Sequence, residues 1–268
     1  MSAMAPFVAL ACHDTPGFAA QVRDAVETHR AVLLTGGSPG GDHATFYRRI
    51  AEEIGNFHFK DENPDTGALD RSGWLDMRYD PRLAERHPYR YGNGRMGLHV
   101  DGSYSDVDFD IIFFYCEAPA DFGGATTVID GARIVECLRL YDAALLDELL
   151  VTPVIFGKGA RTRTEHILRI VDGIARLNWN ATRVAPENSA QVIDMAQRFD
   201  RFCEEGLVDG GVVRQVRLER GDALFLHNRL TLHGRCSFWG ARCLMKGAIT
   251  RAPASHPVGA TDAIPAAK

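Results

Sequence analysis

Short β-rich runs separated by turns fill the chain from Met96 onward, and this pattern restricts the possible fold more than any other feature. The run Phe109–Cys116 is strongly strand-like because aromatic and β-branched residues dominate it. The dipeptide Asp172-Gly173 separates two apolar runs, residues 167–171 and 174–179, and predicts a hairpin turn between them. The other strands predicted in this region cover residues 125–130, 151–156, 212–218, 223–227 and 244–250.

Helical periodicity dominates the first third of the chain. Apolar residues recur at helical spacing in residues 16–30 and 44–54, and a buried-strand pattern, residues 31–35, lies between them. Two later helices are predicted over residues 132–150 and 189–205, the second with Gly206 just past its end.

The sequence contains no internal repeat and no polar linker, so we expect a single domain over residues 1–268. Short strands with helices packed outside them favour a mainly β fold with flanking helices. The expected core is a β-sandwich or jelly roll, that is, a double-stranded β-helix.

The composition limits the classes of partner. Hydrophobic residues make up 46% of the chain and charged residues 24%, with a net charge of −5, so nothing indicates binding to nucleic acid or to an acidic membrane. The N-terminal residues 1–11 lack the basic start and long apolar stretch of a signal peptide, and no apolar run reaches the length of a transmembrane helix. We therefore expect a cytoplasmic protein. None of the six cysteines forms a C-x-x-C pair, and Cys116 and Cys137 are predicted to be buried free thiols.

A candidate metal site begins at His99 and Asp101, which are separated by one residue. On an extended chain residues i and i+2 point to the same face, so the imidazole and the carboxylate can reach one point. Two histidines and one carboxylate occupy one face of an octahedron and leave three positions open, which suits oxygen activation by non-haem iron(II). A second histidine from a distant strand is needed, and His227 and His233 are the candidates.

The motifs around this pair extend the pattern. A G-G-x-T motif ends at Thr126, and later come N-R-x-x-x-H-G-R, residues 228–235, and Arg242. In this order and spacing the motifs resemble the taurine dioxygenase/clavaminate synthase superfamily of iron(II)- and 2-oxoglutarate-dependent oxygenases. The resemblance is close over residues 96–130 and 221–251 and covers the rest in outline.

The resemblance implies roles for individual residues. The family ligand follows the motif arginine by four residues, which selects His233 over His227 as the third iron ligand beside His99 and Asp101. Arg242 is implied as the partner of the distal carboxylate of 2-oxoglutarate, and a planar guanidinium matches a carboxylate in bidentate fashion. Thr126 is implied to support that carboxylate, with Thr127 as its rival.

Substrate-binding residues are also suggested. Lys246 takes a position where several relatives carry an arginine that binds an anionic group of the substrate, and Arg251 is the alternative. The polar stretch of residues 60–95 is long and irregular, which is typical of an active-site lid. Within it, Arg78 and Tyr91 are candidate contacts for a small amphiphilic acid.

The implied activity uses iron(II), with 2-oxoglutarate and O2 as co-substrates, and releases succinate and carbon dioxide. We expect hydroxylation or desaturation of a small amino-acid-derived or other acidic metabolite. The oxygenases of isocyanide biosynthesis and the clavaminate synthase-like amino-acid hydroxylases match the motifs equally well. Asp101 argues against a halogenase, which needs the carboxylate position vacated. A zinc hydrolase on the same three residues and a non-catalytic jelly-roll binding module remain as alternatives.

Overall fold

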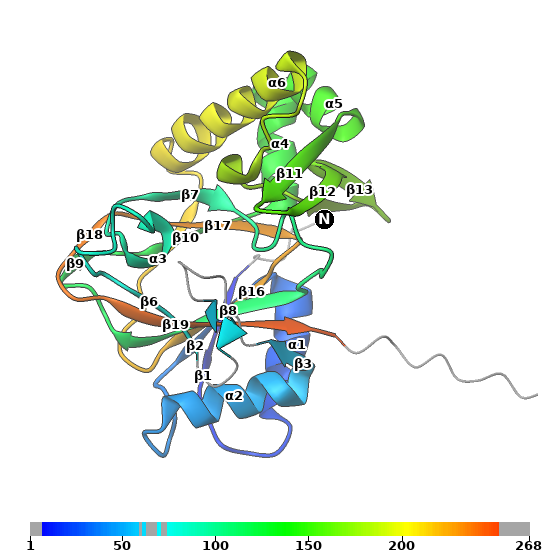
Figure 1. The fold of residues 1–268 in the computed structure, drawn as a ribbon. Helices are drawn as coiled ribbons and strands as arrows, with labels where there is room; N and C mark the ends of the chain where they lie inside the picture. The colour runs from blue at the N-terminus through cyan, green and yellow to red at the C-terminus, as the bar shows by residue number, and fades with distance from the viewer. Residues whose placement is uncertain (1–6, 59–60, 63–68, 71–73, 252–268) are drawn as a thin grey trace, which may run out of the picture.

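The computed structural model describes residues 7–58, 61–62, 69–70 and 74–251. Its centre consists of two β-sheets stacked face to face (Figure 1). The larger sheet has the strand order β1-β2-β16-β8-β19-β3. The strand β6 also pairs with β19, beside β3. The pair β1 and β2 is parallel, and the other pairs of this sheet are antiparallel. Its strands are β1 (Val8–Ala11), β2 (Ala31–Thr35), β3 (Asn56–His58), β6 (Leu75–Arg78), β8 (Ile111–Ala118), β16 (Ala223–His227) and β19 (Cys243–Thr250).

The smaller sheet faces the larger one and carries the candidate metal site. Its order is β15-β10-β17-β7, antiparallel throughout, with bounds β7 (Met96–His99), β10 (Thr126–Asp130), β15 (Arg214–Val216) and β17 (Thr231–Arg235). Two stacked, largely antiparallel sheets confirm the predicted mainly β, jelly-roll fold.

Side-chain alternation along β8 explains why its sequence is apolar throughout. Ile112, Phe114 and Cys116 point between the two sheets. Ile111, Phe113 and Tyr115 point to the opposite side, where helices cover the sheet. A strand buried on both faces needs apolar residues at every position rather than at every second one.

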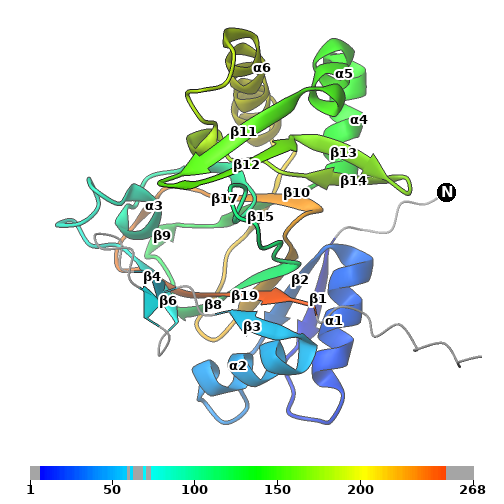
Figure 2. The ribbon, with the colours of Figure 1, turned by 45° about the vertical axis from the view of Figure 1, so that its right-hand side comes forward.

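Helices cover the outer faces of both sheets, as Figure 2 shows. α1 (Phe18–His29) and α2 (His43–Ile54) pack on the larger sheet. Over the smaller sheet lie α4 (Gly131–Tyr141), α5 (Ala143–Val151), α6 (Ala190–Arg201) and the π-helix η2 (Phe202–Asp209). The hairpins β11 (Pro153–Lys158) with β12 (Arg161–His166) and β13 (Leu168–Val171) with β14 (Ile174–Leu177) lie beside them.

The remaining elements are short: β4 (Asp61–Glu62), β5 (Leu69–Asp70), α3 (Pro88–Tyr91), β9 (Phe122–Gly123), η1 (Ala181–Arg183) and β18 (Phe238–Trp239). None of the helices in the described part of the chain is long and apolar enough to cross a membrane. The six cysteines are free thiols, and Cys116 and Cys137 are buried as predicted.

Three predictions of local structure were wrong in detail. The helix predicted over residues 132–150 is two helices, because the Asp142 side chain accepts the N–H of Leu145 and starts a new helix. The helix predicted to end before Gly206 continues as a π-helix to Asp209. The strand predicted over residues 174–179 ends at Leu177.

Candidate metal centre and active-site cavity

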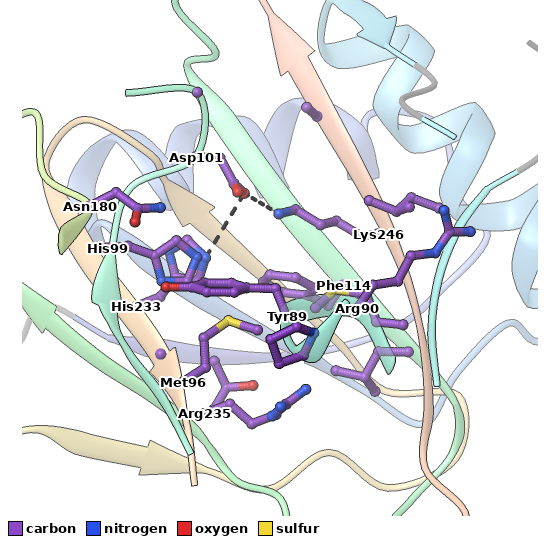
Figure 3. Close-up of a pocket in the computed structure, with 18 of the residues that line it drawn as sticks. Tyr89, Arg90, Met96, His99, Asp101, Phe114, Asn180, His233, Arg235 and Lys246 are labelled. Atoms are coloured by element: carbon purple, nitrogen blue, oxygen red, sulfur yellow. Dashed lines mark ion pairs between the residues drawn. The ribbon is translucent and has the colours of Figure 1, made fainter. Parts of the chain in front are cut away.

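A cavity of about 400 Å³ opens between the two sheets. It is lined by residues from both sheets, from the segment around α3 and from the region of η1 (Figure 3). His99, Asp101 and His233 line it together with Thr126, Arg242 and Lys246, so residues from four separate segments of the sequence meet here.

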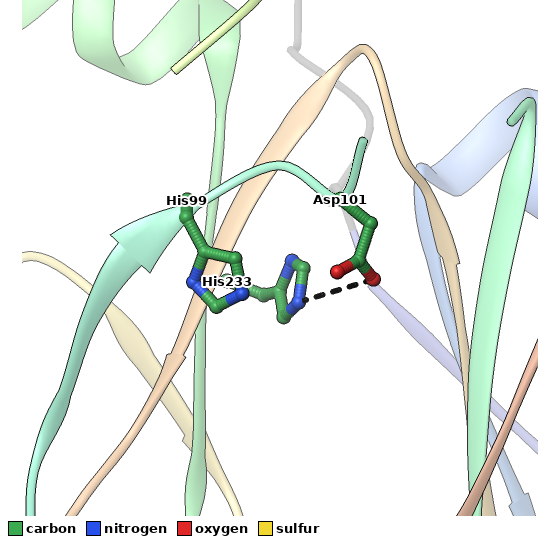
Figure 4. Close-up of side chains that lie close together, drawn as sticks. All are labelled: His99, Asp101 and His233. Atoms are coloured by element: carbon green, nitrogen blue, oxygen red, sulfur yellow. Dashed lines mark ion pairs between the residues drawn. The ribbon is translucent and has the colours of Figure 1, made fainter. Parts of the chain in front are cut away.

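Strand pairing brings the two histidines together. His233 on β17 lies directly opposite His99 on β7, and their ring centroids are 4.2 Å apart. Asp101 follows β7 on the same face, and its Oδ2 lies 3.9 Å from His233 Nε2, which is beyond hydrogen-bond distance (Figure 4). One ligand atom from each of the three residues lies within 4.8 Å of the others, so the three can hold a single ion.

The protonation of this group suits a metal. His99 Nδ1 is 2.9 Å from the carbonyl oxygen of Gly97, which can only accept, so Nδ1 carries the proton and the Nε2 lone pair is available. Burial lowers the pKa of His99 and lowers the pKa of His233 well below its usual range. Both imidazoles are therefore kept neutral. Within the described residues His233 Nδ1 has no hydrogen-bond partner.

Asp101 is held ionised and in place. Its burial would raise the pKa of the carboxyl group, but the charge of Lys246, followed by the two histidines, outweighs burial and holds the pKa well below its usual range. Lys246 pairs directly with Asp101 Oδ2. The backbone of Asp101 is fixed by Asn228, whose Oδ1 accepts its N–H at 2.9 Å and whose Nδ2 donates to its carbonyl at 3.0 Å.

Two glycines in the motifs are required by close packing. Gly102 has φ +69°, and a Cβ there would meet the ring of Phe109 at 3.1 Å. A Cβ on Gly234 would lie 2.6 Å from the carbonyl oxygen of Met96, so only glycine lets β17 approach β7 beside His233. The glycines of H-x-D-G and H-G-R therefore serve the alignment of the ligands.

This donor set fits iron(II). Two neutral imidazoles and one ionised carboxylate converge from one side, which is the facial arrangement of non-haem iron oxygenases. The remaining coordination positions would face the cavity, where Phe114 and Met96 supply apolar surface.

Two buried arginines line the same cavity. Arg242 and Arg235 are each 5% exposed. Neither has a carboxylate partner among the described residues. Burial, together with the charge of Arg235, lowers the pKa of Arg242 to about 10; burial lowers that of Arg235 to about 10 as well. Arg235 donates to the carbonyl of Gly94 at 2.7 Å. A cavity with buried, uncompensated cations is suited to an anionic ligand.

Alternation along β10 separates the two candidate threonines. Thr126 lines the cavity, whereas Thr127 faces the other side of the sheet, with its Oγ1 2.8 Å from where a Cβ on Gly234 would lie. Of the two, only Thr126 is placed to meet a ligand in the cavity.

Other sequence candidates lie elsewhere. His227 is buried at the end of β16, with Nε2 3.4 Å from Arg251. Arg251 also pairs with Glu27 and does not line the cavity. Arg78 is half-exposed and pairs with Asp76. Tyr91 packs beside His87 and Arg90 but is not part of the cavity wall.

Several cavity residues were not among the site candidates chosen from the sequence. Tyr89 and Arg90 come from the predicted lid, and Figure 3 places Tyr89 against the histidine pair, with its ring centroid 5.9 Å from that of His99. The others, Asn180, Arg183 and Lys158, come from the segments around η1 and the β11–β12 hairpin. No local pattern singles out these residues, because the folding of a distant hairpin brings them to the site.

The sequence comparisons agree with this geometry. Residues 5–249 match the family model described as taurine catabolism dioxygenase TauD, TfdA family. A uridine-5′-phosphate dioxygenase from a Streptomyces species is 26% identical over 208 residues, which cover 72% of this chain and 71% of the relative.

Solved structures share the fold. An asparagine oxygenase in complex with Fe(II), 2S,3S-3-hydroxyasparagine and succinate has a TM-score of 0.66 at 16% identity, over 87% of this chain and 77% of that one. PvcB from Pseudomonas aeruginosa, described as an Fe, α-ketoglutarate-dependent oxygenase from an isonitrile synthetic pathway, has a TM-score of 0.60 at 19% identity, over 91% and 85%.

Fold, cavity and comparisons together define an iron(II)- and 2-oxoglutarate-dependent dioxygenase. More narrowly, the chain belongs to the TauD/TfdA family, whose model spans it from residue 5 to residue 249.

Proposed function

We propose that this dioxygenase oxidises an unactivated C–H bond in a small acidic metabolite, by hydroxylation or desaturation. The observation that carries the proposal is the charge of the cavity. Seven lysine and arginine side chains line it, while Asp101 is the single acidic residue in the described wall. Two anions, 2-oxoglutarate and an acidic substrate, would balance this surplus.

In this proposal His99, Asp101 and His233 hold the iron. Arg242 binds the distal carboxylate of 2-oxoglutarate, with Thr126 beside it, since both line the cavity and Arg242 has no competing acidic partner in the described chain. When bound, iron(II) and 2-oxoglutarate supply the oxidising power for C–H cleavage, and the co-substrate leaves as succinate and carbon dioxide.

The protein's own groups prepare this chemistry. Asn228 fixes the backbone of Asp101, and Lys246 holds its carboxylate from the side of the larger sheet, which keeps a ligand oxygen directed at the ion. Phe114 lies beneath the Lys246 ammonium at 5.5 Å and restricts water at the back of the cavity. In this proposal Lys246, which lines the cavity, also contacts an anionic group of the substrate.

We further propose that the chain forms one domain and that residues 60–95 cover the cavity. Part of this segment, residues 60, 63–68 and 71–73, lies outside the described residues. The described part supports the proposal because His87, Pro88, Tyr89 and Arg90 of the α3 region line the cavity.

The nature of the acidic substrate is suggested by the relatives. The asparagine oxygenase is described with a hydroxylated amino acid, another neighbour, OrfP, with (3S)-hydroxy-L-Arg, and the Streptomyces relative is named for a nucleoside monophosphate. Amino acids and phosphate esters both carry an anionic group that the cavity could bind. A zinc hydrolase on the same three residues would leave the buried arginines without a function.

The test uses anaerobic protein loaded with iron(II). Addition of 2-oxoglutarate should produce a weak visible absorption band, and with O2 and a panel of amino acids and phosphate esters at least one compound should stimulate succinate formation. Asp101→Ala should abolish both signals with the fold intact. Asp106→Ala, which removes an exposed carboxylate from the same loop, is the matched control and should behave like the wild type. The absence of the band and of succinate in the wild-type protein would refute the proposal, above all if zinc restored a hydrolytic activity.

A further inference from the structure

The cations of the cavity wall divide into groups by their partners. Lys246 pairs with Asp101, and Arg90 pairs with Asp76. Arg242 is accounted for by the proposed 2-oxoglutarate site, and Arg235 donates to the carbonyl of Gly94. Three cations of the wall are left, Arg86, Lys158 and Arg183. Of these, Arg183 has no carboxylate partner in the described part of the chain, and its guanidinium lies beside the ring of Tyr104. Arg183 is partly buried, and a guanidinium in a cavity wall without an acidic partner is suited to binding an anion.

The position of Arg183 is rigidly determined. It ends the short helix η1 (Ala181–Arg183). Asn180 is the N-cap of that helix, and its Oδ1 accepts from Thr182 N at 3.1 Å and from Thr182 Oγ1 at 2.8 Å. The next residue, Val184, pairs with Phe156 on β11. Asn188 then clamps the same strand through both the N–H and the carbonyl of Ile155. Arg183 is therefore presented by an anchored turn and not by a free loop.

A second cation is placed beside it. The Tyr104 ring has Lys158 Nζ and Arg183 Cζ each 5.7 Å from its centroid, so one ring positions both charges. Tyr104 follows Asp101 by three residues, and the carbonyl of neighbouring Ser103 accepts from Asn178 at 3.1 Å. The two cations are thus tied to the same turn that presents the metal-ligating carboxylate.

An amide donor completes the arrangement. Asn180 is buried and lines the cavity; its Oδ1 is used by Thr182, and Nδ2 has no hydrogen-bond partner among the described residues. Figure 3 shows Asn180 beside His99 on the side away from Arg235. Asn180, which caps the helix that Arg183 ends, therefore lies apart from Arg235 in the cavity.

We propose that Arg183, with Lys158 and the amide of Asn180, forms a second anion subsite that binds a carboxylate or phosphate group of the substrate. This inference rests on the proposed function and narrows it. The substrate is an acid whose anionic group lies against η1 and the β11–β12 hairpin, while 2-oxoglutarate takes the opposite side of the metal centre. Two positive charges and one N–H donor match the oxygen atoms of either anion.

The subsite is tested by binding rather than turnover. Two matched pairs of probes differ in one anionic group: L-aspartate with L-asparagine, and uridine 5′-phosphate with uridine. Their affinities are measured by calorimetry on anaerobic protein loaded with iron(II) and 2-oxoglutarate, and inorganic phosphate is titrated into metal-free protein. At least one anionic probe should bind more tightly than its neutral partner. Arg183→Met should weaken anion binding about tenfold and remove that preference, because one charged hydrogen-bond donor is lost.

The controls separate this inference from the proposed function. Arg183→Lys should retain part of the preference, and Arg161→Met, which removes an exposed charge from the same hairpin outside the cavity, should match the wild type. All variants should keep wild-type affinity for 2-oxoglutarate, read from the visible band. If that band forms but no probe, including phosphate, binds in a manner that depends on Arg183, the subsite is refuted and the proposed function stands. If the band is absent in the wild type, the proposed function itself has failed.

Discussion

Replacement of Arg242 by methionine should raise the stability of the metal-free protein while it destroys co-substrate binding. Arg242 is a buried cation, 5% exposed, with no acidic partner in the described residues. Burial, and then the charge of Arg235, lowers its pKa from 12.5 to about 10. A base whose pKa is lower in the folded state destabilises that state at every pH below the lowered value. The shift corresponds to a cost of roughly 3 kcal/mol at neutral pH.

The same charge becomes favourable once a carboxylate is bound. A buried carboxylate that loses its charged partner is destabilised by about 3–5 kcal/mol, which weakens binding between roughly a hundredfold and several thousandfold. Methionine has a similar length and can fill the space beside Gly124, where the Arg242 side chain now packs. We therefore expect Arg242→Met to gain up to about 3 kcal/mol in the free energy of unfolding without ligand.

Two measurements on one protein preparation check this. Urea denaturation followed by circular dichroism gives the free energy of unfolding of metal-free protein, and anaerobic titration of the visible band gives the 2-oxoglutarate affinity. Arg139→Met, an exposed substitution on α4, serves as the control and should change neither value. Unchanged 2-oxoglutarate affinity in Arg242→Met would assign the carboxylate to another residue. A marked loss of stability would show that the guanidinium is satisfied in the metal-free protein, and the reasoning would be wrong.

Two further predictions concern the residues that support the site. Asn228→Ala should lower the free energy of unfolding by about 3 kcal/mol and weaken binding of iron(II) or cobalt(II). The reason is that the backbone of Asp101 and the carbonyl of Phe109 lose their buried hydrogen-bond partners. Wild-type values in urea denaturation and in metal titration would contradict this role. For His227, burial first and then the charges of Arg251, Arg30 and Arg176 lower the pKa from 6.5 to about 3. Between pH 6.5 and about pH 3, this histidine is protonated in the unfolded chain and neutral in the folded protein. The free energy of unfolding therefore falls as the pH decreases through this range. His227→Leu should reduce this loss by about 3 kcal/mol between pH 7 and pH 4, seen as a smaller difference in urea midpoint between these two pH values. Equal differences in variant and wild type would count against a buried neutral imidazole.

The predicted elements show where local information is sufficient. The strands at residues 31–35 and 223–227 were predicted with the bounds that the structure has, because a central strand buried on both faces must be apolar at every position. The hairpin at Asp172-Gly173 was equally clear, since both residues adopt positive φ, 52° and 76°. β12 was not predicted because it is a polar strand that pairs only with β11, so its sequence carries no apolar alternation.

For the candidate site, the sequence by itself determined the residue types and the local geometry of the ligands. The H-x-D spacing places His99 and Asp101 on one face of an extended segment. His233 was selected over His227 through the family resemblance, by the register of Asn228-Arg229, and it lies beside the other two residues in the structure. The tertiary structure alone decided which charges share the cavity. It excluded Arg78, Tyr91 and Arg251 from the wall and brought in Arg235 and Arg183. Periodicity along a strand is a property of neighbouring residues, and a sequence displays it directly. The meeting of η1, β17 and β19 at one cavity depends on long-range sheet pairing and hairpin packing, which no local spacing records.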